Sequence, residues 1–171
     1  VKLSLANPAY VRHLANGLAI KTKNDGMDSF VLARYGLSTQ PKLWNPAPVE
    51  AQLLQALLSR REAVAQDLQR ERNREEKAQV ANVPDKIQQS IETSISFLEQ
   101  QLKKIQDDID DHIDKHPKLK QDVKLLESIP AVGERVGNTM LSVLHNHHFE
   151  SAEQVAAYLG LVPVEYQSGT S

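Results

Sequence analysis

Two aspartates separated by two residues, Asp25 and Asp28, have the type and spacing that metal-dependent chemistry requires. At a helix start, residues three apart lie on one face, so the two carboxylates would be close together. Carboxylates that converge on Mg2+ allow the metal to stabilise the attacking and leaving oxygens of a phosphoryl transfer. An aspartate at this position can also simply cap the helix and interact favourably with its dipole. Spacing alone favours the cap, and the magnesium site stays open as the alternative.

A second group of candidates lies where a helical pattern is interrupted by Pro130-Ala131-Val132-Gly133 and then resumes. This is the pattern of a helix-hairpin-helix, in which backbone N–H groups at the start of the second helix bind a DNA phosphate without reading sequence. Gly133 would let the DNA backbone approach closely, whereas Ala131 stands where the motif usually has its first glycine. A purely structural turn is an equally open interpretation. The candidate DNA-binding residues are Pro130, Val132, Gly133 and Arg135.

Two further groups carry a weaker signal. Ser168 precedes Gly169 in a loop after a helix that ends at Gly160, and a serine in this setting is ordinarily a turn residue. The run His145-Asn146-His147-His148 lacks the spaced partner pair of a zinc site. We therefore expect the histidines to lie in a solvated loop between helices.

The elements that must position the aspartates are expected in the first 46 residues. The opening Val1-Lys2-Leu3-Ser4-Leu5 alternates apolar and polar residues, which predicts a short strand. Asn7-Pro8 then predicts a helix start. A second helix is expected from Asp25 to Tyr35, closed by Gly36. The segment 41–48 contains three prolines and predicts a linker.

Residues 49–78 and 86–115 are expected to form two long helices. The second range carries apolar residues that step by three and four throughout, and Asn82-Val83-Pro84 separates the two ranges. This pattern predicts an antiparallel hairpin or coiled coil. Apolar stripes that the hairpin does not bury itself would join copies of the chain, so we expect a dimer or higher oligomer through residues 49–115. After His116-Pro117, three short helices and a loop are expected.

Composition limits the classes of function. The chain of 171 residues has no cysteine, which excludes thiolate metal sites, disulfides and cysteine nucleophiles. No apolar run is long enough for a membrane span and no signal peptide is visible, so a soluble cytoplasmic protein is expected. The net charge is −2, but residues 1–46 carry six Lys and Arg against two acids. A local positive field around Asp25 and Asp28 would suit a site that handles phosphate.

Taken in order, these segments resemble the DEDD-type (Piv/MooV-like) bacterial insertion-sequence transposases, a family that includes bridge-RNA-guided recombinases. The stretch from Lys21 to Asp28 is similar to the end of the family's RuvC-like domain, where a Lys-Thr stretch precedes the last two catalytic acids. The helical middle resembles its coiled-coil insertion. Four segments resemble its C-terminal transposase domain: Ser128–Gly133, Phe149–Ala152, Ala156–Pro163 and Gln167-Ser168-Gly169.

The resemblance implies a mainly α chain in three parts. Residues 1–46 would be the C-terminal part of an RNase H/RuvC-like α/β domain, 47–116 the coiled-coil hairpin, and 117–171 the start of the C-terminal domain. It makes Asp25 and Asp28 two of four acids that bind Mg2+, and Ser168 the nucleophile that joins covalently to DNA, with Ser171 as its rival. The other two acids would precede Val1, so the chain alone is expected to be inactive.

The partners that the resemblance implies are DNA and, for part of the family, a guide RNA, in the bacterial cytoplasm at the nucleoid. Two other classes of function stay open. One is a non-enzymatic DNA-binding module built on the helix-hairpin-helix, and the other is an oligomerisation scaffold built on the coiled coil. An upstream strand carrying Gly-x-Asp, followed by a Glu on another strand, would favour the enzyme.

Overall fold

The computed structural model describes residues 2–20, 22 and 24–162, and their regular elements are helices. The chain divides into two compact units, with the boundary between Pro46 and Ala47. The described residues form seven helices: α1 (Pro8–Gly17), α2 (Asp25–Thr39), α3 (Val49–Ala81), α4 (Asp85–Lys115), α5 (Pro117–Glu127), α6 (Glu134–Asn146) and α7 (Ala152–Tyr158). The prediction of a mainly α chain is confirmed. None of these helices is long and apolar enough to cross a membrane.

The first unit is a pair of helices, each begun by an asparagine. The Asn7 side chain accepts a hydrogen bond from the Ala9 N–H at 2.9 Å, and Pro8 occupies the first turn of α1. The Asn24 side chain accepts from the Met27 N–H at 2.9 Å at the start of α2. The two helices contact each other, yet the buried apolar residue that they share is Val31 alone among the described residues.

Two local predictions for this unit were wrong. The opening segment forms no strand within the described residues: Ser4 and Leu43 make an isolated antiparallel bridge, flanked by a hydrogen bond from the Trp44 N–H to the Leu3 carbonyl at 2.7 Å. Alternating residues extend into a strand only where a partner provides a full ladder, and here the partner provides one bridge. Gly36 does not close α2, because a glycine inside a helix costs only about 1 kcal/mol; the helix runs on to Thr39.

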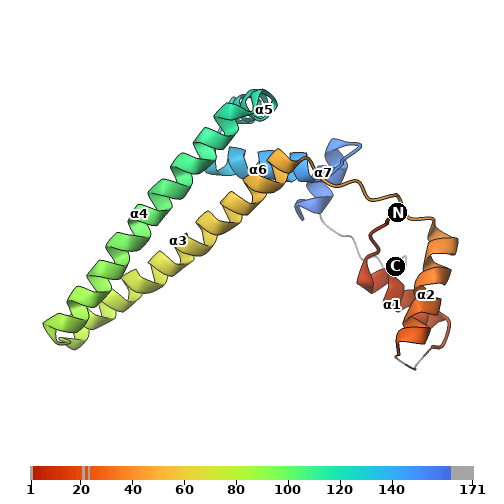
Figure 1. Cartoon of the computed structure of the whole chain (residues 1–171), viewed down its shortest axis with the longest axis horizontal. Helices are drawn as coiled ribbons and strands as arrows, with labels where there is room; N and C mark the ends of the chain where they lie inside the picture. Colours follow the sequence, from red (N-terminus) through yellow and green to blue (C-terminus); the bar gives the residue numbers. More distant parts are fainter. Residues whose placement is uncertain (1, 21, 23, 163–171) are drawn as a thin grey trace, which may run out of the picture. The chain divides into compact units, whose positions relative to one another are not determined.

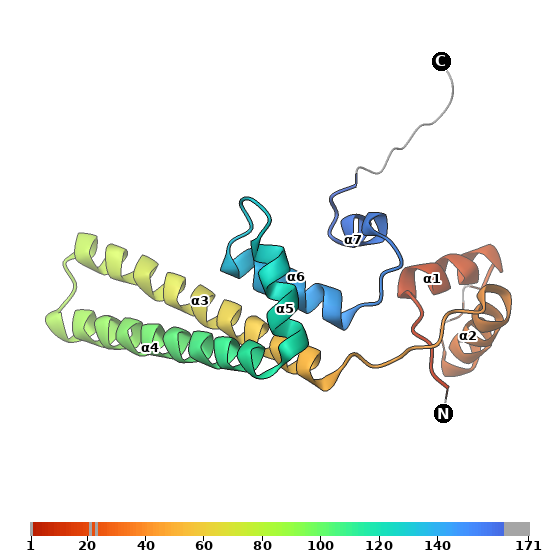
Figure 2. The same ribbon diagram turned by 90° about the horizontal axis from the view of Figure 1, so that it is seen from above.

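The second unit is built on a long antiparallel hairpin of α3 and α4, as the spacing predicts (Figures 1 and 2). Asn82 ends α3 in the left-handed conformation, with φ of 54°, and its N–H donates to the Gln79 carbonyl. Val64 of α3 and Ile109 of α4 lie within the core of this unit, with 1% and 0% of their surface exposed.

The seam between the two long helices is less well covered toward the turn that joins them. On α4, Ile87 beside the turn is 52% exposed, and Phe97, farther along the helix, is 59% exposed. On α3, the half-buried positions between Leu68 and Ala78 are occupied by Glu71 and Glu75 instead of apolar residues. The hairpin therefore buries its apolar stripe fully at its open end and only in part near the turn.

Three short helices close the open end of the hairpin, again as expected. Helix α5 packs on α4 and α6, and α6 packs on α3 (Figure 2). Leu119 and Val123 of α5 and Leu141 of α6 complete the core formed by the hairpin. Ser151 caps α7 by accepting from the Gln154 N–H, and a hydrogen bond from the Ser151 side chain lowers the pKa of Glu153.

Candidate functional site

Asp25 and Asp28 occupy the first turn of α2, as the sequence predicts, but the hydrogen-bonding cap of this helix is Asn24. The backbone of Asn24 also accepts from the Asp28 N–H at 2.9 Å. Within residues 2–20, 22 and 24–162, neither aspartate carboxylate has a hydrogen bond or an ion pair. Both carboxylates are therefore available to a ligand from outside the described chain, and they add to the helix through its dipole alone.

Asp28 borders an open hollow of about 450 Å³ between α1 and α2. Apolar side chains such as Val11 and Val31 line much of it, while Arg12 and Asn16 contribute polar groups. No group of three or more His, Asp or Glu side chains comes together as a metal site anywhere in the described parts of the chain. Carboxylate oxygens suit Mg2+. Two of them are too few for a complete site, so further ligands would have to come from elsewhere.

The turn between α5 and α6 places its one left-handed residue at Ala131, with φ of 69°. The Val132 N–H donates to the Ile129 carbonyl at 3.0 Å, which closes the turn beside the exposed Pro130. Gly133 precedes α6 in an ordinary extended conformation, with φ of −86°, and a Cβ added there would meet no atom within 4 Å. The fold therefore needs a residue tolerant of positive φ at position 131 and has no need of glycine at 133.

The start of α6 has the free backbone groups that a phosphate could use. Among the described residues no side chain caps this helix, and a backbone hydrogen bond across its start runs from the Gly137 N–H to the Gly133 carbonyl at 2.8 Å. The N–H groups of the first turn have no partner inside a helix. However, the acidic Glu134 lies in the same turn and offsets the positive end of the helix dipole.

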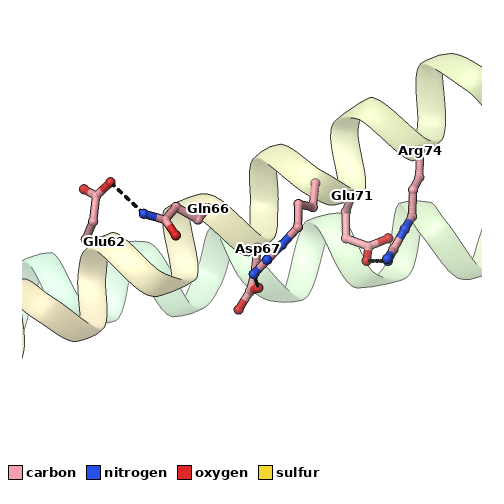
Figure 3. Close-up of polar contacts among 6 residues, drawn as sticks. Glu62, Gln66, Asp67, Glu71 and Arg74 are labelled. Atoms are coloured by element: carbon pink, nitrogen blue, oxygen red, sulfur yellow. Dashed lines mark hydrogen bonds and ion pairs between the residues drawn. The ribbon is translucent and has the colours of Figure 1, made fainter.

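Arg135, a candidate phosphate ligand, is already paired within the chain. Its Nη2 lies 2.5 Å from Oε2 of Glu62 on α3, although the two side chains are 70% and 49% exposed. The other carboxylate oxygen of Glu62 accepts from Nε2 of Gln66 at 3.4 Å, in a row of polar contacts along α3 that also joins Arg74 to Glu71 (Figure 3). A phosphate that approached Arg135 would compete with the Glu62 carboxylate for its guanidinium.

Glu134 is tied to the hairpin in the same way. Nε2 of Gln106 on α4 donates to Glu134 at 2.5 Å and to Asp110 at 2.9 Å, while the Gln106 carbonyl accepts from Arg61 at 2.8 Å. Both charged residues of the first turn of α6 therefore hold it against α3 and α4. The sequence gives no signal for these pairs, because their members are 73 and 28 residues apart.

The prediction that the whole histidine run lies in a solvated loop is wrong for His145. His145 lies in the last turn of α6 and its side chain is 11% exposed, with Nε2 2.8 Å from Oδ2 of Asp122 on α5. The helix extends two residues further than the loop interpretation assumed, which turns His145 toward α5. His147 and His148 follow the helix and are exposed, as expected. His147 makes one contact that the sequence did not reveal, a hydrogen bond to the Tyr158 hydroxyl at 2.8 Å.

The two serines proposed as nucleophiles, Ser168 and Ser171, lie outside the described residues, which end at Val162. Their interpretation therefore depends on sequence alone.

Known proteins match this chain over its whole length. Residues 123–171 match the Transposase IS116/IS110/IS902 family. The chain is 34% identical over 173 residues to the pilin gene-inverting protein of Moraxella bovis and 35% identical to that of Moraxella lacunata. Each alignment covers 99% of this chain and 52% of the relative, so the chain spans about half the length of the curated relatives it matches.

Proposed function

The chain belongs to the IS116/IS110/IS902 transposase family, and from this premise we propose that the full-length protein recombines DNA by cutting and rejoining strands. Here "full-length protein" means a protein of the relatives' length that contains this chain. The observation that carries the proposal is the similarity over 99% of the chain to proteins named for inverting a gene. The proposed partner is DNA at the bacterial nucleoid, with a guide RNA in those members that use one.

Asp25 and Asp28 are proposed to contribute two of the carboxylates of a magnesium site. Their position one helical turn apart and their lack of partners within the described residues support this role. Magnesium at such a site would stabilise negative charge on the attacking and leaving oxygens of a phosphodiester. The remaining carboxylates would come from the part of the full-length protein that this chain does not include.

Ser168 is proposed as the nucleophile, with Ser171 as the rival. Attack by the hydroxyl oxygen on phosphorus, with loss of the hydroxyl proton to solvent, would form a phosphoserine bond to one strand and release the other strand end as its bond to phosphorus breaks. The resemblance of Gln167-Ser168-Gly169 to the family's C-terminal domain supports the choice. A serine hydroxyl is a poor nucleophile at neutral pH and needs a base or a polarised phosphate to react.

The turn before α6 is proposed as a sequence-independent phosphate contact. The open backbone N–H groups at the start of α6 and the absence of any neighbour near Gly133 support it. Because such contacts go to phosphate, binding is expected to weaken steeply with salt.

A covalent-adduct assay on the full-length protein tests the proposal. Incubation with Mg2+ and a DNA duplex carrying a recombination site should give a protein–DNA adduct, which Ser168→Ala and Asp28→Asn each abolish. If subunits share sites, mixing these two variants should restore part of the activity. An adduct that survives in Ser168→Ala but is lost in Ser171→Ala would transfer the role to Ser171. Absence of any adduct in the unaltered protein would reject the serine mechanism.

A further inference from the structure

A tyrosine and a histidine form an exposed hydrogen-bonded pair near the end of the described chain. The Tyr158 hydroxyl, at the end of α7, lies 2.8 Å from Nε2 of His147, the residue that follows α6. The two ring centroids are 4.6 Å apart, and the Phe149 ring packs edge-on against Tyr158 at 5.5 Å. Tyr158 is 55% exposed. The pair is thus held in place by ring contacts while its polar edge stays open to solvent.

The chemistry of this pair is that of a proton donor, the phenol, held by a second hydrogen-bond donor, the imidazole. A phenol keeps its proton at neutral pH. When Nε2 of His147 carries its proton and donates to the phenol oxygen, the phenol O–H is free to donate outward. The same N–H then stabilises the phenolate that remains after the proton has left.

The neighbouring histidines lack this arrangement. His145 is nearly buried and engaged by Asp122, and His148 is exposed with no hydrogen bond among the described residues. Within residues 134–162, His147 and Tyr158 therefore form an exposed hydrogen-bonded pair, which neither His145 nor His148 does.

We propose that Tyr158 is the general acid that protonates the leaving strand end during DNA cleavage and that His147 is its positioning residue. This inference rests on the proposed function. As the bond between phosphorus and the leaving oxygen breaks, its electron pair takes the Tyr158 proton, so that the strand end departs as a hydroxyl. The phenolate keeps the hydrogen bond from His147. In rejoining, the same phenolate takes the proton of the attacking strand hydroxyl, as microscopic reversibility requires.

The proposed reaction has a need that this pair meets. Cleavage by a serine develops negative charge on the leaving strand oxygen. Magnesium would stabilise that charge, but the carboxylates that bind the metal are ionised and cannot supply the proton that turns the strand end into a hydroxyl. His147 and Tyr158 lie in residues 123–171, the segment that matches the transposase family. Tyr158 and the hydrogen bond that joins it to His147 are exposed, so a DNA strand can reach the pair.

The test compares two DNA substrates in the full-length protein. In the first the scissile phosphate is normal; in the second, sulfur replaces its bridging oxygen on the leaving side, with 5′ and 3′ versions both prepared. A thiolate leaves without being protonated. Tyr158→Phe should therefore slow cleavage of the oxygen substrate by roughly 10²- to 10⁴-fold, the usual contribution of a general acid, and leave cleavage of the thio substrate near the unaltered rate. His147→Ala should act in the same direction, and His148→Ala, the matched control, should change neither rate.

Each outcome separates this inference from its alternatives. Equal slowing of both substrates by Tyr158→Phe would mean that the pair only fastens α7, and would overturn the proposal. So would an unchanged rate on the oxygen substrate. If the unaltered protein cuts neither substrate, the proposed recombinase function fails first. If it forms the adduct normally while Tyr158→Phe is indistinguishable from it, only the general acid is rejected.

Discussion

At the scale of single residues, the residue that caps α2 is different from the two aspartates proposed to bind the metal. Asn24 provides the hydrogen-bonding cap, whereas the Asp25 and Asp28 carboxylates have no partner in the described chain. Caps and catalytic acids often compete as explanations for aspartates at a helix start. Here Asn24 provides the cap, so substitutions can test the capping role and the metal-binding role independently.

Replacing Asp25 or Asp28 by Asn should therefore leave folding nearly unchanged, with a loss confined to the helix-dipole contribution of about 0.3–1 kcal/mol or less. Asn24→Ala is the control, and it should cost about 1 kcal/mol because it removes the side-chain acceptor of the Met27 N–H. Chemical denaturation of the three variants measures the free energy of unfolding of each. A larger loss in either aspartate variant than in Asn24→Ala would return the aspartates to a structural role.

In the turn before α6, a substitution at Gly133 can likewise distinguish an effect on folding from an effect on DNA binding. Gly133→Ala should fold as well as the unaltered chain, because φ at this position is ordinary and no atom lies near the added Cβ. If DNA approaches the backbone here, the same change should weaken DNA binding in a filter or fluorescence assay. Unaltered binding would remove Gly133 from the interface.

Ala131→Gly is the matched control in the same turn. It relieves the left-handed strain at φ of 69° and should raise the free energy of unfolding by up to about 1 kcal/mol, since part of the gain is lost to the greater freedom of glycine in the unfolded chain. DNA binding should not fall. Destabilisation by Ala131→Gly would show that the Ala131 methyl group makes a contact that the fold requires.

At the scale of elements, α6 is held to the hairpin by polar contacts as much as by its core. Leu141 is fully buried, but Asn146 donates to the Ala51 carbonyl at 2.9 Å, and Arg135 pairs with Glu62. Asn138 is 1% exposed, and its Nδ2 has no hydrogen-bond partner within the described part of the chain. Helix α6 is therefore attached to the hairpin both by apolar burial and by polar contacts.

The Arg135–Glu62 pair should restrain DNA binding. Glu62→Gln removes the charge that occupies Arg135, so affinity for DNA should rise, by about fivefold at most because exposed ion pairs are worth only about 0.2–1 kcal/mol. Glu99→Gln is the control: Glu99 pairs with Arg72 at 2.8 Å with similar exposure, elsewhere on the hairpin. Binding isotherms at fixed salt measure both variants. An equal gain in both would indicate a general charge effect, and no gain would leave Arg135 without a role in binding.

At the scale of the whole molecule, the structure changes the basis of the expected oligomer. Much of the apolar stripe on α4 is covered within one chain, and Leu102 packs against the core of the second unit. On α4 the exposed large apolar residues are Ile87, near the hairpin turn, and Phe97, farther along the helix; α3 exposes Val80 beside the same turn and Val49 and Leu53 at its other end. Dimerisation through residues 49–115 stays a prediction, now centred on Ile87 and Phe97.

Light scattering at tens of micromolar tests it. The chain should be a dimer or larger, and replacing Ile87 and Phe97 by Ser should yield monomers that keep their helical content. Leu102→Asp is unsuitable as a probe because it would place a charge against the core. Leu125→Ser, which removes an equally exposed apolar side chain from α5, is the control and should leave the oligomer intact. A monomeric unaltered chain would reject the prediction.

The sequence by itself determined the elements of this protein. Asparagine and proline mark the start of α1, apolar residues at steps of three and four define α4, and Asn82-Val83-Pro84 ends α3, since caps, periodicity and breakers act within a few residues of the chain. The same local patterns pointed to Asp25, Asp28 and the turn at Gly133 as candidates. They misjudged the opening segment and the extent of α2, where the outcome depends on partners that local pattern does not contain.

Tertiary structure decided which candidates are free and which are engaged. Only packing of α6 on α3 could show that Arg135 is paired with Glu62, and only the return of α7 past the end of α6 could bring Tyr158 to His147. Such contacts join residues distant in sequence through side chains with many rotamers, so no short-range pattern encodes them. The partial burial of the apolar stripe on α4 could not be predicted for the same reason, because it depends on which α3 side chains lie opposite each turn of α4.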